Sequence, residues 1–198
     1  MMGLRRAWWA AWRRWRALAL AAALLCALSV RVPAELASAH HFPAHSPADL
    51  AHSLADFSNQ PHVDSWSVEE DRSNYTTWRY TVSFSCGARC TGHAAVLAHD
   101  EPLTAPRHGH AAREHRVSVA RRSCTNLPLI PWPQFCEELE INAVVKGSSG
   151  GGALLHEVSH TRCSALAWLS GACARWLRAQ QDFRIMRLRA LQDVPQPA

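Results

Sequence analysis

The feature that most constrains this chain is an alternating segment that ends in a cysteine and is followed by a second cysteine. Side chains of one face are mostly apolar and those of the other are small and polar: Tyr80, Val82, Phe84 and Cys86 against Thr81, Ser83 and Ser85. Such alternation predicts a half-buried strand that carries the Cys86 thiol inward. The turn-length gap before Cys90 places the second sulfur near the first. We expect this pair to anchor a disulfide framework, with later segments bonded to it.

The first 39 residues have the pattern of a secretory signal peptide. A basic stretch containing Arg5, Arg6, Arg13, Arg14 and Arg16 precedes an apolar run from Ala17 to Val30. That run has 14 residues, whereas a membrane-spanning helix needs about 20. Ala37-Ser38-Ala39 offers a small-x-small cleavage site. We predict a cleaved signal peptide over 1–39, with an uncleaved signal anchor as the alternative, and a secreted, extracellular mature chain without a membrane span.

Removing the signal changes the charge balance. The whole chain has 21 basic and 16 acidic side chains, but six basic residues and one acidic residue lie within 1–39. The mature chain is therefore nearly neutral, apart from its 12 histidines. This composition argues against a nucleic-acid-binding surface.

Cysteine usage supports the same compartment. Six cysteines follow the signal: Cys86, Cys90, Cys124, Cys136, Cys163 and Cys173. An even number in a secreted chain predicts disulfides, although the sequence leaves their pairing open. The sequon Asn74-Tyr75-Thr76 predicts a glycosylation site at Asn74.

Four regions follow from the patterns along the chain. Behind the signal, 40–64 is an extension rich in His, Ala and Pro, in which Ser46 and Pro47 can begin a short helix. Residues 65–150 form a disulfide-rich β domain, whose clearest later strand is 137–146, whereas 91–113 reads as a loop or a loosely paired ribbon. After a glycine-rich break, 151–198 shows helical periodicity. The predicted fold is mainly β, with an α-helical C-terminal tail.

The β region resembles a known family of secreted proteins. Ser65-Trp66 is followed by acidic residues, Cys86 lies 20 residues beyond Trp66, and Val119 to Cys124 reads Val-Ala-Arg-Arg-Ser-Cys. From Trp66 to Gly147 the chain resembles the interleukin-17 cytokines, which implies a small, cystine-knot-like β module that dimerises. Ser148 and Ser149 stand where that family has its closing cysteines. Cys86 and Cys90 would then need other partners. These could be the two cysteines Cys163 and Cys173, or the two cysteines Cys124 and Cys136.

The resemblance implies a secreted, cytokine-like signalling ligand that binds a cell-surface receptor as a homodimer, without a cofactor or a catalytic group. Aromatic and arginine side chains near strand ends are the usual candidates for receptor contacts. In this chain they are Trp66, Trp78, Arg121 and Arg122. The alternative role of each is ordinary, with tryptophan in the core and arginine in solvent.

One motif suggests an enzyme instead. His156-Glu157-Val158-Ser159-His160 matches the His-Glu-x-x-His pattern of zinc peptidases. On a helix, His156 and His160 would share one face and bind zinc, while Glu157 would act as the general base. No third ligand stands six residues after His160, where Leu166 is found. A zinc-dependent metallopeptidase, a structural zinc site that includes Cys163, and a secreted non-signalling binding module remain the alternatives.

Overall fold

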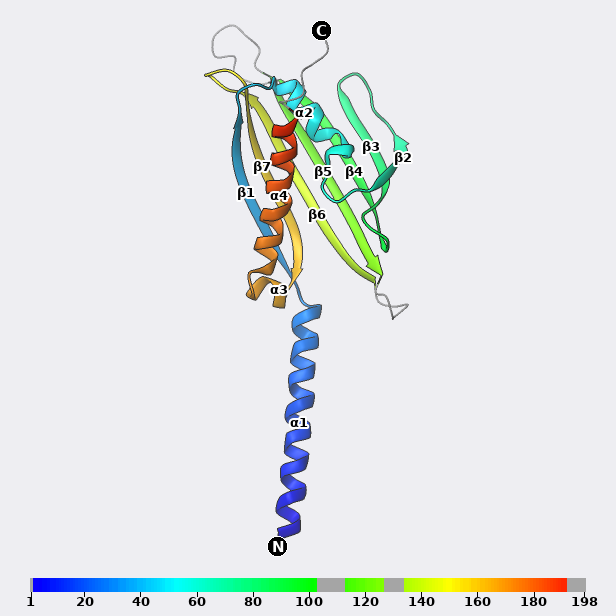
Figure 1. The fold of residues 1–198 in the computed structure, drawn as a ribbon, viewed down its shortest axis with the longest axis vertical. Coiled ribbons are helices and arrows are strands. Elements are labelled where there is room, and N and C mark those ends of the chain that lie inside the picture. Colours follow the sequence, from blue (N-terminus) through cyan, green and yellow to red (C-terminus); the bar gives the residue numbers. More distant parts are fainter. Residues whose placement is uncertain (1, 103–112, 127–133, 192–198) are drawn as a thin grey trace.

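A computed structural model describes residues 2–102, 113–126 and 134–191, and its central element is one seven-stranded antiparallel sheet (Figure 1). The strands are β1 (Arg31–Phe42), β2 (Ser65–Asp71), β3 (Thr77–Ser85), β4 (Cys90–Pro102), β5 (Arg113–Asn126), β6 (Gln134–Gly147) and β7 (Ala153–Ser164). The helices are α1 (Met2–Ser29), α2 (Pro47–Ala55), the 3-10 turn η1 (Phe57–Asn59), α3 (Ala165–Leu169) and α4 (Ala172–Ala190). The prediction of a mainly β fold with C-terminal helices is confirmed.

The first strand of the chain, β1, forms one edge of the sheet. Strands β2 to β7 follow one another as neighbours, and β1 then pairs with β7, which gives the order β1-β7-β6-β5-β4-β3-β2. The β1–β7 ladder runs from the pair of Arg31 and Ser164 to the pair of Phe42 and Ala153. The predicted cleavage motif Ala37-Ser38-Ala39 lies inside this ladder.

Helix α2 forms as its start signals predict. The Ser46 side chain accepts a hydrogen bond from the Asp49 backbone N–H at 3.1 Å, and Pro47 occupies the first helical position. Leu50 and Leu54 are buried, and Phe57 in η1 is also fully buried. Residues 46–59 of the predicted extension therefore carry part of the core.

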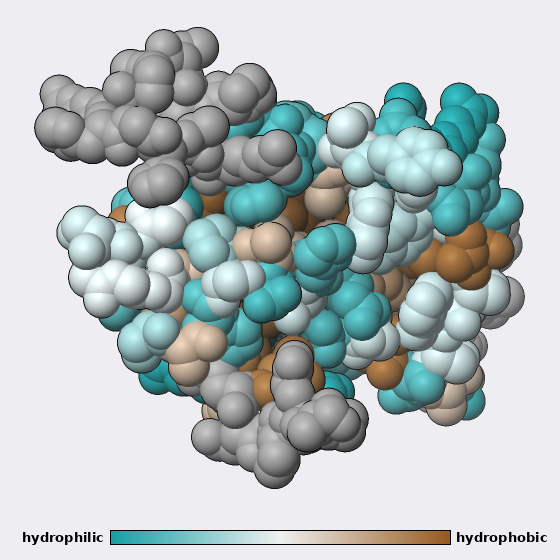
Figure 2. Space-filling view, turned by 90° about the horizontal axis from the view of Figure 1, so that it is seen from above, coloured by the Kyte–Doolittle hydropathy of each residue, from teal (hydrophilic) through white to brown (hydrophobic). Residues whose placement is uncertain are grey.

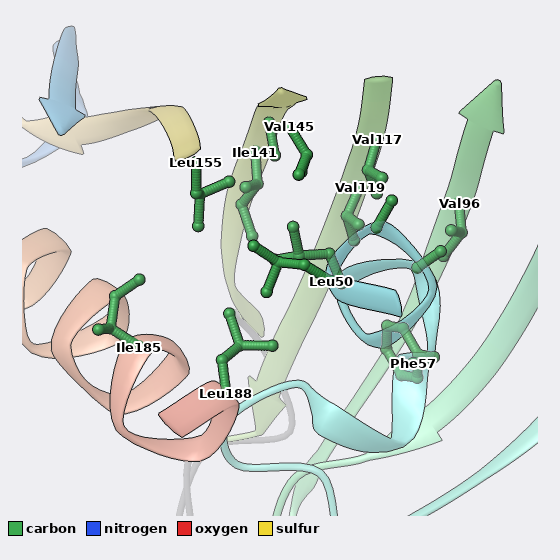
Figure 3. Packing of buried hydrophobic residues seen from close by; sticks show 14 of the residues in the cluster. Leu50, Phe57, Val96, Val117, Val119, Ile141, Val145, Leu155, Ile185 and Leu188 are labelled. Atoms are coloured by element: carbon green, nitrogen blue, oxygen red, sulfur yellow. The ribbon is translucent and has the colours of Figure 1, made fainter. Parts of the chain in front are cut away.

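The core lies between one face of the sheet and the helices α2 and α4. Figure 3 shows Leu50 of α2 among the inward side chains of β5 and β6, while Ile185 and Leu188 of α4 approach from the other side. Strands β3 to β7 contribute alternate residues, such as Val117 and Val119 of β5. Seen from the end farthest from α1, the molecule presents mostly hydrophilic side chains with small hydrophobic patches (Figure 2).

Helix α1 extends away from the sheet (Figure 1). Its leucines from Leu18 to Leu28 are between 45% and 72% exposed. Among the described residues, no helix combines the length and apolar character that a membrane crossing requires.

Two regions differ from the predictions. The helical tail begins at Ala165, because 153–164 forms β7 with Ala153, Leu155, Glu157, Ser159 and Thr161 on its buried face. The polar members of that face hide the strand period. In 91–113, residues up to Pro102 form β4. Gly92, one of the residues that suggested a loop there, is a packing requirement, since a Cβ at this position would collide with the Phe84 ring and the Arg122 carbonyl.

The three disulfides are local. They join Cys86 to Cys90, Cys124 to Cys136 and Cys163 to Cys173, with Cα–Cα separations of 4.9, 4.0 and 6.1 Å. The first closes the turn between β3 and β4, the second links β5 to β6, and the third links β7 to α4. The expectation that the first pair is bonded to later segments is wrong, and these bonds do not form the knot that the resemblance implied.

Tyr80 ties the sheet to the segment between α2 and η1. Its hydroxyl donates to the Ala55 carbonyl and accepts from the Phe57 backbone N–H at 3.1 Å. Burial of the phenol raises the pKa of Tyr80 to about 12. The folded state therefore favours the neutral phenol more strongly than the unfolded chain does.

We predict that Tyr80→Phe lowers the free energy of unfolding at pH 7 by about 1–2 kcal/mol, since two backbone groups lose their partner. Because the folded pKa is raised, Tyr80 contributes stability below the unfolded pKa of about 10 and loses it as the pH rises toward 12. The variant should lack this part of the alkaline decline in urea unfolding curves. Tyr75→Phe is the control, because Tyr75 is fully exposed. Equal curves for Tyr80→Phe and the parent chain would contradict the assignment.

Candidate functional site

The sheet face opposite the helices carries a broad groove with a volume of about 1090 Å³. Every residue that lines it belongs to a strand, and all seven strands contribute. On five strands the lining consists of three consecutive residues, of which the outer two point to this face by strand alternation. We call this surface, represented by Glu35, Glu69, Ala95, Ala120, Glu140 and Arg162, the open-face groove.

The register of the sheet arranges the charges of the groove in two neighbouring rows. In the first, His93 lies opposite Arg122, and Arg122 lies opposite Glu138. Arg162 of β7 continues this row, because it follows the Leu139–Thr161 pair. We call these four residues the basic row.

The second row lies two residues farther along each strand. Ala95 is opposite Ala120, Ala120 is opposite Glu140, Glu140 is opposite His160, and His160 is opposite Glu35. We call these five residues the acidic row. Ala95 and Ala120 leave its middle shallow, while its two carboxylates stand toward the β1 edge.

Within the part of the chain that the structure describes, six charged side chains of the groove form weak ion pairs. His93 Nδ1 lies 3.1 Å from Glu69, Arg122 Nε lies 3.8 Å from Glu138, and His160 Nδ1 lies 3.6 Å from Glu35. All six side chains are at least 42% exposed. Exposed pairs of this kind contribute about 0–1 kcal/mol, so an incoming charged group can replace them.

Two further charges have no ionic partner among the described residues. Glu140 accepts a hydrogen bond from the Asn142 amide at 3.0 Å but lies within ion-pair distance of no described cation. The exposed Arg162 guanidinium has no described carboxylate within that distance. The groove therefore offers one carboxylate and one guanidinium to a ligand.

The four predicted receptor contacts do not share a surface. Trp66 is 42% exposed on the helix-covered side, where its ring lies 6.2 Å from that of Phe57. Trp78 is on the same side, with its ring 4.4 Å from that of His52. Arg122 lines the groove on the opposite face.

Arg121 is buried and has a structural role. It is 7% exposed, and its Nη1 donates to the Pro61 carbonyl at 2.9 Å. Burial and the nearby Arg184 charge lower the pKa of Arg121. The burial of Arg121 could have been predicted from the sequence, because the strand alternation that turns Val117 and Val119 inward also turns Arg121 inward.

The His-Glu-x-x-His motif lies on strand β7 rather than on a helix. His156 and His160 share the open face, but four residue steps along an extended strand separate them by about 13 Å, whereas on a helix they would lie one turn apart. Glu157 points to the opposite face. The helical geometry behind the zinc peptidase hypothesis is therefore wrong, and Cys163 is bonded to Cys173. Within the described ranges, no cluster of three or more His, Cys, Asp or Glu side chains is placed to hold a metal ion.

Glu157 instead forms a buried polar cluster with α4. Its side chain is fully buried, and its Oε1 accepts from Arg184 and from the Ser159 hydroxyl, the latter at 3.0 Å. Arg184 is 3% exposed and also donates to Ser159 Oγ at 3.1 Å. This cluster fixes α4 against β7.

Asn74 lies in the turn between β2 and β3. It is exposed, and its Oδ1 accepts from the Thr76 hydroxyl at 3.1 Å. The neighbouring Tyr75 side chain is fully exposed. Glycosylation at Asn74 stays a prediction, and the site is sterically open to it.

We predict that Glu157→Gln lowers the free energy of unfolding by about 3–5 kcal/mol, because it leaves the Arg184 charge buried without its counter-ion. The double variant Glu157→Leu and Arg184→Met should be more stable than the single variant, since it removes both charges. Urea unfolding measures both changes. A Glu157→Gln protein as stable as the parent chain would contradict a structural role for the ion pair.

Comparisons with known proteins give a likeness in structure alone. No protein-family model matches the sequence, and no curated protein matches it. The crystal structure of the Mll3558 protein from Rhizobium loti is similar, with 13% sequence identity and a TM-score of 0.42. The match covers 80% of this chain and 99% of that chain.

Proposed function

We propose that this protein is an exported, disulfide-bonded binding module that holds an extended polypeptide segment in its open-face groove. The observation that carries the proposal is the pair of charged rows across a sheet face that no described helix covers, with Glu140 and Arg162 lacking ionic partners among the described residues. The module needs no catalytic group. It corresponds to the non-signalling binding protein among the functions that the sequence suggested.

The size of the groove favours a polypeptide over a small molecule. Pockets for small ligands have volumes of about 300–1000 Å³ and enclose most of the ligand. The groove reaches about 1090 Å³ and lies on an open face. Six steps between neighbouring strands of about 4.8 Å each give a span of about 29 Å, which eight or nine extended residues would cover.

The charges of the groove favour a segment that carries both signs. A carboxylate of the ligand can pair with Arg162 in the basic row, and an ammonium or guanidinium group can pair with Glu140 in the acidic row. The rows lie two residues apart along the strands, or about 6.6 Å. This arrangement rewards one orientation of the ligand, because the reversed peptide would place like charges together.

The covalent chemistry supports an extracellular location for the module. Three disulfides are compatible with an extracellular protein, because they persist in oxidising environments. The exposed sequon at Asn74 supports export through a glycosylating secretory route. We therefore propose that the module acts outside the cell.

The cytokine-like ligand remains a prediction from sequence alone, as do its homodimer and its cell-surface receptor. Its four receptor contacts lie on two faces and in the interior of the fold. Binding through the open-face groove requires no signalling response.

We predict that the purified chain selects peptides from a phage-displayed library of random sequences, and that these peptides contain both acidic and basic residues. Arg162→Glu and Glu140→Lys should each weaken the selected peptides about tenfold, or about 1.4 kcal/mol, in fluorescence anisotropy titrations. Arg178→Glu, on the exposed side of α4, is the control for the same change of charge.

Charge-reversed peptides should recover affinity for the reversed variants, which a loss of folding could not produce. Failure to enrich any peptide would contradict the proposal. Equal binding to the parent chain and to both groove variants would contradict it as well.

A further inference from the structure

We infer that the leader is removed by hydrolysis of the peptide bond between Ser29 and Val30, ten residues before the motif that the sequence favoured. A signal peptidase would add water across this bond, leaving a carboxylate on Ser29 and an ammonium group on Val30. The mature chain would then be 30–198. This site is independent of what the groove binds.

The extent of β1 argues against cleavage after Ala39. The strand has 12 residues, and the nine from Arg31 to Ala39 would leave with the signal. All nine pair with β7 in the ladder from Arg31–Ser164 to Ala39–His156. Cleavage there would leave three paired residues and would expose the β7 backbone along most of its length.

Side chains of the same nine residues belong to the folded domain. Ala34 and Leu36 pack against the core. Gln181 of α4, which is 6% exposed, donates a hydrogen bond from its amide to the Ser38 hydroxyl. The segment 31–39 therefore helps to position α4.

The boundary of the domain falls immediately after Ser29. Helix α1 ends at Ser29, and the backbone N–H of Ala165 donates to the Val30 carbonyl at 2.9 Å. The Val30 N–H still donates to the Cys26 carbonyl of α1, but its carbonyl is bonded to the first residue of α3, so Val30 is the first residue tied to the domain. The preceding leucines are largely exposed, so their loss would remove little of the core.

The residues before this bond suit a signal peptidase. Ala27 and Ser29 place small side chains third and first before the scissile bond. The apolar run from Ala17 to Leu25 has nine residues, within the range of about 7–15 for a signal peptide core. The cleavage motif, the end of α1 and the first hydrogen bond to the domain therefore all lie at the bond between Ser29 and Val30.

The test is secretion of the full chain, carrying a C-terminal affinity tag, from cultured eukaryotic cells. The protein is purified from medium and membranes, and its first residue is determined by N-terminal sequencing and by intact mass after deglycosylation. We expect Val30 as the first residue. Ser29→Lys should abolish this product and retain the chain in membranes, because a long charged side chain does not fit a small-residue position.

Ala39→Leu is the matched control. It blocks the alternative motif at an exposed β1 position that accepts a larger side chain, and the product should still begin at Val30. A first residue other than Val30, including His40, would overturn the assigned bond. A parent chain retained with residues 1–29 attached would also overturn it, in favour of an uncleaved anchor.

Discussion

The pairing of β1 with β7 is the interaction on which the rest of the structure depends. It joins a segment near the start of the chain to one more than 110 residues later and completes the sheet. It also supplies Ser38, which the Gln181 side chain contacts, so the same ladder helps to hold α4 over the sheet. Because α4 and α2 cover one face, the other face is left to the groove. The location of the candidate site is thus a consequence of where the first strand docks.

The buried cluster of Glu157, Ser159 and Arg184 adds specificity to this packing. Burying an ion pair costs desolvation, which its Coulombic attraction roughly offsets, so the pair contributes little net stability compared with apolar side chains of similar volume. Its directional hydrogen bonds favour one position of α4 relative to β7. A motif typical of zinc chemistry is therefore split by strand alternation, with the glutamate inside and the histidines on the groove face.

Sequence patterns predicted the elements whose inward faces are apolar. The strands around Val82 and Ile141 and the capped helix after Ser46 lie where alternation and capping place them. Strand β7 was misread because its inward face includes the polar residues Glu157, Ser159 and Thr161. Their partners Arg184 and the Glu138 carbonyl lie 23 to 27 residues away in the sequence. The groove could not be predicted either, because its rows depend on the register of strands that only the folded sheet brings together.

The local disulfides also change the view of what stabilises the chain. Their sequence separations are 4, 12 and 10 residues, and loops this short correspond to about 2–3 kcal/mol each in the chain-entropy model. Among the described residues, the hydrophobic core contains 16 buried side chains larger than alanine, and each contributes about 1.5–3 kcal/mol on burial. The core thus outweighs the disulfides, which reinforce the ends of hairpins and the start of α4. A sheet that does not depend on long-range cross-links can leave one face uncovered and still present fixed rows of charge to a partner.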